Sequence, residues 1–358
     1  MFNRSVNELL GTELPIIQSP MAGVQDSALT VAVTESGGLG SLPCGMLSVE
    51  EIVSELRLIK DATDKPYNLN FFCHEMLSYD EQRQLKWQQR LEPYFAELGV
   101  KVENLSSSAN RSPFNNEVAD AIEPFKPEFI SFHFGLPNKA LLARIKQWGT
   151  TIVSSATTVE EAIWLEANGA DGIIAQGLEA GGHRGMFLSG DISSQMGMSS
   201  LVPQIIKKVK VPVIAAGGIG DARDVHAALL LGASAVQIGT AYLLCAEAKT
   251  SQLHRSAIKS AKSDHTALTN IFSGRPARGI VNRAMKELGY INSLAPVFPY
   301  AAIEMAQLRG HAEAINADDF SPLWCGQKAS ACKEISAREL TLLLVPKRLP
   351  VNDIHKVP

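Results

Sequence analysis

The sequence predicts an α/β fold of the TIM type, a (β/α)8 barrel with additional helices and loops towards the C-terminus. Eight short apolar runs alternate with helical patterns along the 358 residues, as expected for parallel strands buried on both faces. Residues 165–177 and 229–240 resemble each other as successive helix–strand units, each with Gly-Ala before an apolar strand that ends near a Gln. The first strand lacks the GxGxxG turn of a dinucleotide-binding sheet, which favours a closed barrel over an open one.

The predicted elements follow one another in a regular order. The strands are expected at residues 15–21, 38–43, 67–72, 129–135, 151–156, 172–177, 211–218 and 235–240. Residues 26–36 have a helical pattern, Ser48 is a favourable N-cap for the helix after the second strand, and a long polar helical region runs to about Gly99.

Beyond about residue 250 the alternation fades. Residues 255–265 and 334–345 have helical patterns, and residues 270–300 are rich in Gly, Pro, Asn and Arg. We therefore expect a single domain over residues 1–358, in which part of 250–358 forms extra helices and loops packed over the barrel.

Composition and charge exclude several classes of protein. Hydrophobic residues make up 46% and charged residues 20%, which is enough apolar material for a large core. The net charge is −4 without a basic cluster, so no nucleic-acid partner is expected. Residues 227–246 are apolar and long enough to cross a bilayer, but Gly232 and Gln237 interrupt them. We interpret this stretch as a helix end, a turn, a buried strand and the start of the next helix, not as a membrane segment.

The five cysteines are scattered along the chain, odd in number and without a CxxC pair. This usage favours a reducing, cytoplasmic environment over a disulfide framework or a structural zinc site.

His183 is the candidate catalytic residue. It follows Gly181 and Gly182 in the segment QGLEAGGHRG after the sixth strand, where a TIM barrel places its active site. A lone histidine could merely cap a turn, but this position favours acid–base work or anion recognition. Glu179 has no second ligand at a suitable spacing, so no metal site is predicted.

Two glycine-rich segments follow the last two strands, at residues 215–224 and 237–242, where TIM barrels commonly bind phosphate. The residues suited to this are Gly217, Gly218, Gly220, Gly239 and Thr240. Glycine is also common in plain β-to-α turns, but two such loops in this order indicate a phosphorylated cofactor or substrate.

Polar residues near other strand ends are further candidates. Asn68 and Asn70 are two apart and therefore share a face, and Asn70 could meet the edge of a pyrimidine-like ring or be satisfied within a turn. Gln176 ends the sixth strand and could act similarly. His133 ends the fourth strand and is either a group facing the substrate or a buried, hydrogen-bonded histidine. Met21 could pack against a flat ring.

Taken together, these segments resemble the nitronate monooxygenase family, formerly called 2-nitropropane dioxygenases, and in particular its class I members. The resemblance runs from about residue 12 to 282. It rests on ELPIIQSPMAG (13–23), NLNFFCH (68–74), QGLEAGGHRG (176–185), PVIAAGGIGD (212–221) and QIGTAYL (237–243).

The resemblance implies a barrel that binds FMN non-covalently, with His183 as the active-site histidine. Such enzymes use O₂ to oxidise an anionic nitronate, such as propionate 3-nitronate, to a carbonyl compound plus nitrite or nitrate. The residues that the resemblance places beside FMN are Met21, Ala22, Gly23, Asn70, Gln176, Gly181, Gly218, Gln237, Ile238, Gly239 and Thr240. Gly217 joins them from the glycine-loop argument above.

His133, Arg184 and Tyr300 are the candidate substrate residues, and Arg184 could pair with a carboxylate. In class I members a tyrosine-rich helix with a lysine lines the pocket, whereas here Ala301, Ile303, Glu304 and Gln307 follow Tyr300. The partners implied are a small nitronate and O₂, in a monomer or homodimer.

Two alternative functions stay open. One is an NAD(P)H-dependent FMN quinone or enoyl-thioester reductase of the same superfamily. The other is a non-catalytic barrel that binds a phosphorylated ligand, since fold does not determine function. A barrel like IMP dehydrogenase is excluded because no cysteine lies between Cys73 and Cys245 to serve as its nucleophile.

Overall fold

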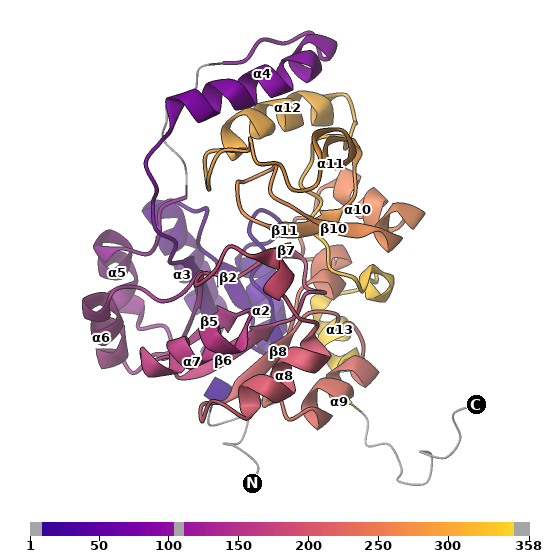
Figure 1. Ribbon diagram of the computed structural model, residues 1–358. Coiled ribbons are helices and arrows are strands. Elements are labelled where there is room, and N and C mark those ends of the chain that lie inside the picture. Colours follow the sequence, from indigo (N-terminus) through magenta and orange to yellow (C-terminus); the bar gives the residue numbers. More distant parts are fainter. Residues whose placement is uncertain (1–8, 104–110, 347–358) are drawn as a thin grey trace.

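All eight predicted strands are present in one parallel sheet that curves into a nearly closed barrel (Figure 1). The computed structural model describes residues 9–103 and 111–346, so the ends of the expected 1–358 domain lie outside the described residues. The strands are β1 Ile16–Gln18, β2 Ser41–Pro43, β3 Asn68–Phe72, β4 Phe129–His133, β5 Thr151–Ala156, β6 Gly172–Gln176, β8 Val213–Ala216 and β9 Ala235–Ile238. Their order in the sheet is β1-β9-β8-β6-β5-β4-β3-β2. The prediction of a TIM-type barrel is confirmed.

The barrel closes between β1 and the residues that lead into β2. Ile17 pairs with Leu39 in a parallel bridge, and Gln18 N donates to Leu39 O at 2.9 Å. We call this closure between β1 and β2 the seam. The Gln18 side chain adds to it, because its Oε1 accepts a hydrogen bond from Ser41 N at 3.1 Å. Backbone and side-chain hydrogen bonds therefore join the first and second strands.

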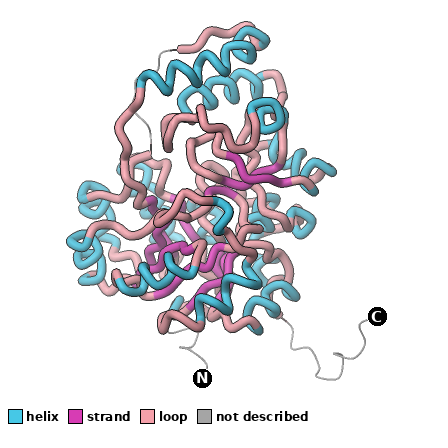
Figure 2. The backbone as a smooth tube through the Cα atoms, viewed as in Figure 1, coloured by secondary structure: helices cyan, strands magenta, loops and turns pink. Residues whose placement is uncertain are grey.

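A ring of helices covers the outside of the sheet (Figures 1 and 2). Ser48 begins α3 with a capping box that includes Glu51, as predicted, and Asp26 caps α2 through the Ala28 amide. The helices of the ring are α2 Ser27–Glu35, α3 Val49–Ala62, α5 Asn116–Ile122, α6 Lys139–Gln147, α7 Val159–Ala167, α8 Met198–Ile206, α9 Ala222–Leu230 and α13 Ala337–Leu343.

The last helix of this ring comes from far along the chain. Leu340 of α13 packs in the same apolar core as Leu29 and Val33 of α2. The hydroxyl groups of Tyr242 and Thr341 lie 2.9 Å apart and tie α13 to the residues that follow β9. The chain between them is thus an insertion before the final barrel helix.

The strands alternate between the two sides of the barrel wall. Ile16, Ile173 and Val213 pack outward beneath the helices, whereas their neighbours Ile17, Ile174 and Ile214 fill the interior. Leu9 and Leu10 belong to this interior cluster, and Leu9 approaches Gly172 at the start of β6. The amino ends of the strands are therefore closed by apolar side chains.

A second layer, here called the cap, consists of α4 Glu81–Glu97 and residues 266–325, and lies beside the barrel (Figure 1). Residues 266–325 contain the helices α11 Arg283–Leu288 and α12 Ala302–Ala314 and the strands β10 Thr266–Thr269 and β11 Ala277–Ile280. The two segments share a core of their own, which includes Trp87, Leu91, Phe272, Met285 and Leu308. The long polar region predicted after the third strand is α4, and it packs on α12 rather than on the barrel wall.

The apolar stretch 227–246 divides as predicted. It contains the end of α9, the buried strand β9 and a 3-10 helix over Thr240–Leu244. Within residues 9–103 and 111–346, no helix combines the length and apolar character needed to cross a bilayer.

A Gly40→Ala variant tests how tightly α2 packs against the seam between β1 and β2. A Cβ atom on Gly40 would lie 1.9 Å from Thr30 O, so Gly40→Ala forces this helix away from the sheet. We expect the free energy of unfolding to fall by about 3 kcal/mol in urea titrations. The matched control is Gly310→Ala, where a Cβ meets open space within α12, and a gain of up to about 1 kcal/mol is expected there. Equal effects in the two variants would contradict this account of the seam.

Candidate active site

A cavity of about 280 Å³ lies at the carboxyl ends of the barrel strands, between the barrel and the cap. Residues 19–24, 176, 179–183, 216–219, 237, 239 and 240 line it from the barrel, and Ser321 to Trp324 line it from the cap. The predicted residues in its wall are Met21, Ala22, Gly23, Asn70, His133, Gln176, Gly181, His183, Gly217, Gly218, Gln237, Gly239 and Thr240. Ile238 instead points into the outer core of the barrel wall. Residues from distant parts of the chain therefore meet in one place.

Strand register brings the polar strand ends to one level. Gln176 of β6 is paired with Ala216 of β8, which is paired with Gln237 of β9. Asn68 and Asn70 share the inner face of β3, as predicted, and both donate hydrogen bonds to Ser131 Oγ, at 2.9 and 3.0 Å. The amide side chains of Asn70, Gln176 and Gln237 thus line the cavity, whereas Asn68 is buried beneath it.

Close backbone contacts form another part of the wall. Gly217 and Gly218 have φ angles of 109° and 70°, a region that favours glycine. A Cβ atom on Gly181 would lie 2.7 Å from Cys325 C, so only glycine allows the loop after β6 to approach the end of the cap here. Just beyond the cap, Gly326 N donates to Thr240 Oγ1 at 2.9 Å, which joins this segment to the loop after β9.

Three sets of hydrogen bonds hold His183 in place. The short strand β7, Gly182–His183, pairs with β11 of the cap in an antiparallel sheet. The His183 carbonyl oxygen accepts hydrogen bonds from Gln176 Nε2 at 2.9 Å and from His133 Nε2 at 3.1 Å. On the ring side, His183 Nε2 lies 2.8 Å from Ser273 Oγ. Both barrel and cap therefore position the candidate catalytic histidine.

The surroundings of His183 keep its ring neutral. Its imidazole contacts aromatic rings on several sides, with centroid distances of 5.7 Å to Phe298 and 5.6 Å to Trp324. Burial lowers the pKa of His183 well below its usual value, and the nearby charges of Arg111 and Arg275 lower it further. At neutral pH the imidazole thus offers one N–H donor and one acceptor, without a charge.

His133 supports His183 from below. A carbonyl oxygen can only accept, so His133 Nε2 carries the hydrogen toward His183 O, and Nδ1 accepts from Ser155 Oγ at 3.0 Å. Burial lowers the pKa of His133 to about 4. His133 is half-buried, lines the cavity and is hydrogen-bonded through both ring nitrogens.

Arg184 is placed differently from the expectation that it faces a substrate carboxylate. Its side chain is fully buried and does not line the cavity. The guanidinium donates to Gly177 O and Gln176 O, both at 2.8 Å, and to Gln195 Oε1 at 2.9 Å. Arg184 thus folds back under its own loop and fixes that loop to the end of β6.

Tyr300 also lies outside the cavity wall. Its hydroxyl donates to Leu77 O at 2.9 Å, and its ring contacts Tyr79. The α12 residues that depart from the family pattern make contacts within the cap as well: Glu304 accepts hydrogen bonds from two glutamines of α4, and Gln307 accepts one from Glu103 N. The family pattern expects pocket residues at these positions of α12. In this chain the residues there contact α4 and Glu103 instead.

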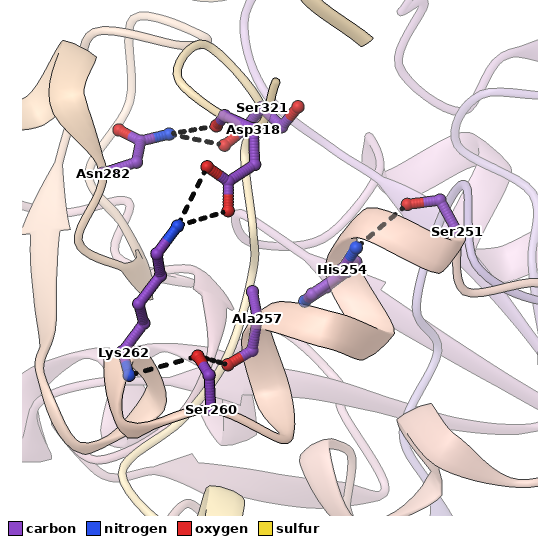
Figure 3. Close-up of polar contacts among 8 residues, drawn as sticks. All are labelled: Ser251, His254, Ala257, Ser260, Lys262, Asn282, Asp318 and Ser321. Carbon is purple, nitrogen blue, oxygen red and sulfur yellow. Dashed lines mark hydrogen bonds and ion pairs between the residues drawn. The ribbon is translucent and has the colours of Figure 1, made fainter. Parts of the chain in front are cut away.

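His254 of α10, Gln252–Ile258, and the preceding Ser251 line another wall of the cavity (Figure 3). Ser251 caps α10 through the His254 amide at 3.3 Å. Asn282 Nδ2 donates to Ser321 O at 2.9 Å, and Lys262 Nζ lies 3.0 Å from an Asp318 carboxylate oxygen (Figure 3). These contacts fix the turn that carries the lining residue Ser321.

Several lining residues had no recognisable signal in the sequence. Arg111, Trp324 and Gly326 lie outside every predicted strand end, and they meet the cavity only because the two insertions fold over the barrel. Across the part of the chain that the structure describes, no group of three or more His, Cys, Asp or Glu side chains is arranged to hold a metal ion.

The whole chain is similar to proteins of one known family. A family model described as "Nitronate monooxygenase" matches residues 3–347. A nitronate monooxygenase of Pseudomonas aeruginosa is 39% identical over 94% of this chain and 97% of its own length, and one of Paraburkholderia phytofirmans is 37% identical over 95% and 94%. The solved structure of a nitroalkane oxidase from Streptomyces ansochromogenes superposes with a TM-score of 0.85 at 33% identity, covering 95% of this chain and 96% of that one.

The buried histidines predict how stability depends on pH. Burial lowers the pKa of both His133 and His254 from 6.5 to about 4, so between these values the unfolded chain takes up protons that the folded chain does not. Their contribution to stability is therefore fully present above pH 6.5 and is lost as the pH falls towards 4. We expect the thermal midpoint to drop over this window, and to drop less in His133→Gln. The exposed His311→Gln is the control, and equal pH dependence in all three proteins would contradict the prediction.

Proposed function

This chain belongs to the nitronate monooxygenase family, and from that membership we propose that it is an FMN-dependent enzyme oxidising alkyl nitronates with O₂. The products would be a carbonyl compound with nitrite or nitrate, and propionate 3-nitronate is the type of substrate meant. One observation carries the proposal: a neutral, half-buried His183 faces a cavity whose other walls are glycine backbone and strand-end amides.

The residues present fit FMN. Gln237 lines the cavity, yet its Oε1 is buried without a hydrogen-bond partner among the described residues, as expected for an acceptor that awaits a ligand N–H group. The backbone of Gly217 and Gly218 turns through conformations that favour glycine, which leaves room for close approach of a phosphate.

We assign the ring and phosphate contacts accordingly. The phosphate would be held by Gly217, Gly218, Gly239 and Thr240. The ring would lie along Met21, Ala22 and Gly23, with Asn70, Gln176, Gly181 and Gln237 at its polar edge. Ile238 would contribute through its backbone, since its side chain is buried in the barrel wall. When bound, FMN supplies the electron acceptor that no side chain of this cavity provides.

His183 would hydrogen-bond the nitronate rather than deprotonate it. A nitronate is already ionised at carbon, so no base is needed to generate it. The lowered pKa also makes His183 a weak base, which disfavours attack on a neutral nitroalkane. A neutral N–H donor held by Gln176, His133 and Ser273 would suit the negative charge that a nitronate carries on its two oxygens.

The role of His183 is tested by His183→Asn, which keeps a donor but not the imidazole. We expect kcat/KM for nitronates to fall by about 100-fold while bound flavin, followed by its visible absorbance, is retained. His311→Asn, at an exposed position of α12, is the matched control and should behave as the unaltered protein. Full turnover in a His183→Asn protein that retains FMN would rule out a central role for this residue.

The proposed activity itself is tested by an anaerobic absorbance spectrum of the purified protein, recorded before and after adding propionate 3-nitronate and then NADPH. We expect a flavin spectrum that changes with the nitronate and not with NADPH. Rapid bleaching by NADPH alone would support a reductase instead. A colourless protein that takes up no FMN would overturn the proposal and favour a non-catalytic barrel.

A further inference from the structure

Four cationic side chains line the cavity, and one of them differs from the rest. Three are paired with carboxylates: Lys249 with Asp26 at 3.2 Å, Arg309 with Glu313 at 2.8 Å and Lys328 with Asp224 at 3.2 Å. Arg111 also lines the cavity but takes part in no ion pair within residues 9–103 and 111–346. It is therefore the cation whose charge is left for a ligand.

Arg111 is held by stacking instead of by charge. Its guanidinium lies 5.5 Å from the ring centroid of Phe298. Its Nη1 atom is buried and has no hydrogen-bond partner among the described residues. A buried guanidinium donor without a partner is costly, and an anion that enters the cavity would remove that cost. The neighbouring Arg275 differs, because it donates to Met186 O at 3.0 Å and does not line the cavity.

Arg111 and His183 both line the cavity and share a neighbour. Phe298 contacts both, with its ring 5.7 Å from the His183 ring. Of the neighbouring charges, Arg111 has the largest effect on the pKa of His183. A ligand held by His183 is therefore within the influence of Arg111.

The glycine loops that we assign to phosphate lie elsewhere around the barrel. Arg111 belongs to the segment between β3 and α5, where Phe114 N donates to Phe72 O at 2.8 Å. In the sheet, β3 is separated from β8 by β4, β5 and β6. The anion that Arg111 meets is thus not the phosphate of a flavin bound at Gly218 and Gly239.

We infer that Arg111 determines substrate specificity by binding a carboxylate at the end of the substrate remote from the nitronate group. This inference rests on the proposed function, in which His183 holds the nitronate itself. The planar guanidinium can donate two parallel hydrogen bonds to a carboxylate, which an uncharged alkyl end cannot accept. Arg111 is therefore the residue by which this chain would distinguish short acidic nitronates from simple alkyl nitronates.

The kinetic test compares propionate 3-nitronate with propyl 1-nitronate, which has a methyl group in place of the carboxylate. In Arg111→Gln we expect kcat/KM to fall by about 100-fold for the acidic substrate, mainly through KM, and by less than about threefold for the alkyl one. Arg111→Lys should recover part of the loss, because lysine restores the positive charge but cannot donate the two parallel hydrogen bonds of a guanidinium. Equal losses on both substrates would overturn the inference and assign Arg111 to the nitronate group or to the fold.

The matched control is Arg283→Gln, which removes an arginine that stacks on Tyr94 of the cap, 5.6 Å from its ring centroid, but does not line the cavity. It should leave the ratio of the two kcat/KM values unchanged. A change in that ratio comparable to the one in Arg111→Gln would attribute the effect to a loosened cap and overturn the inference.

A binding measurement separates this inference from the proposed function. Butyrate should raise the thermal midpoint of the unaltered holoprotein, whereas its neutral analogue butyramide should not, and the butyrate effect should be absent in Arg111→Gln. No turnover of either nitronate, with this butyrate effect intact, would reject the proposed function and leave the carboxylate site standing. No difference between butyrate and butyramide would overturn the site.

Discussion

The carbonyl oxygen of His183 accepts hydrogen bonds from Gln176 and His133, and the form of the cavity depends on this junction. The two donors stand at the ends of β6 and β4, so the rigid barrel sets where the loop after β6 can run. Gln176 Oε1 also accepts a hydrogen bond from the Gly185 amide at 2.8 Å, so the loop is fixed on both sides of the histidine. Beneath it, the buried Arg184 satisfies the last carbonyls of the strand. The backbone of the candidate catalytic histidine is thus held by side chains of the barrel.

The cap completes what the barrel begins. It is built from two segments inserted at different strand ends, and their shared apolar core holds them together. The cap supplies the strand that pairs with His183, the hydroxyl group of Ser273, and aromatic rings that pack against the imidazole. Burial by these rings, with the charge of nearby arginines, is why His183 stays neutral. The same enclosure leaves the Arg111 guanidinium inside the cavity without a counter-ion among the described residues, and this combination underlies the proposed preference for acidic nitronates.

Sequence patterns predicted the barrel well because its physics is local. A parallel strand buried on both faces must be a short apolar run, and a close βα turn must be glycine, so β6 and Gly218 could be recognised from their own neighbourhoods. The alternation of side chains along a strand likewise placed Asn68 and Asn70 on one face. The helix α4 was recognised as a helix, but nothing in its sequence told that its partner would be α12, more than 200 residues along the chain.

By itself, the sequence determined the barrel, the ends of its strands and the loop that carries His183, because strand burial and turn conformation depend on residues close in the chain. Only the tertiary structure decided which polar side chains face the cavity. Arg184 lies next to His183 yet turns beneath its loop, where three acceptors await its guanidinium. Arg111 lies in no motif yet lines the cavity beside Phe298, which is 187 positions further on. A long cationic side chain goes wherever folding leaves it an acceptor or a ring to contact, and those partners come together only when distant segments pack.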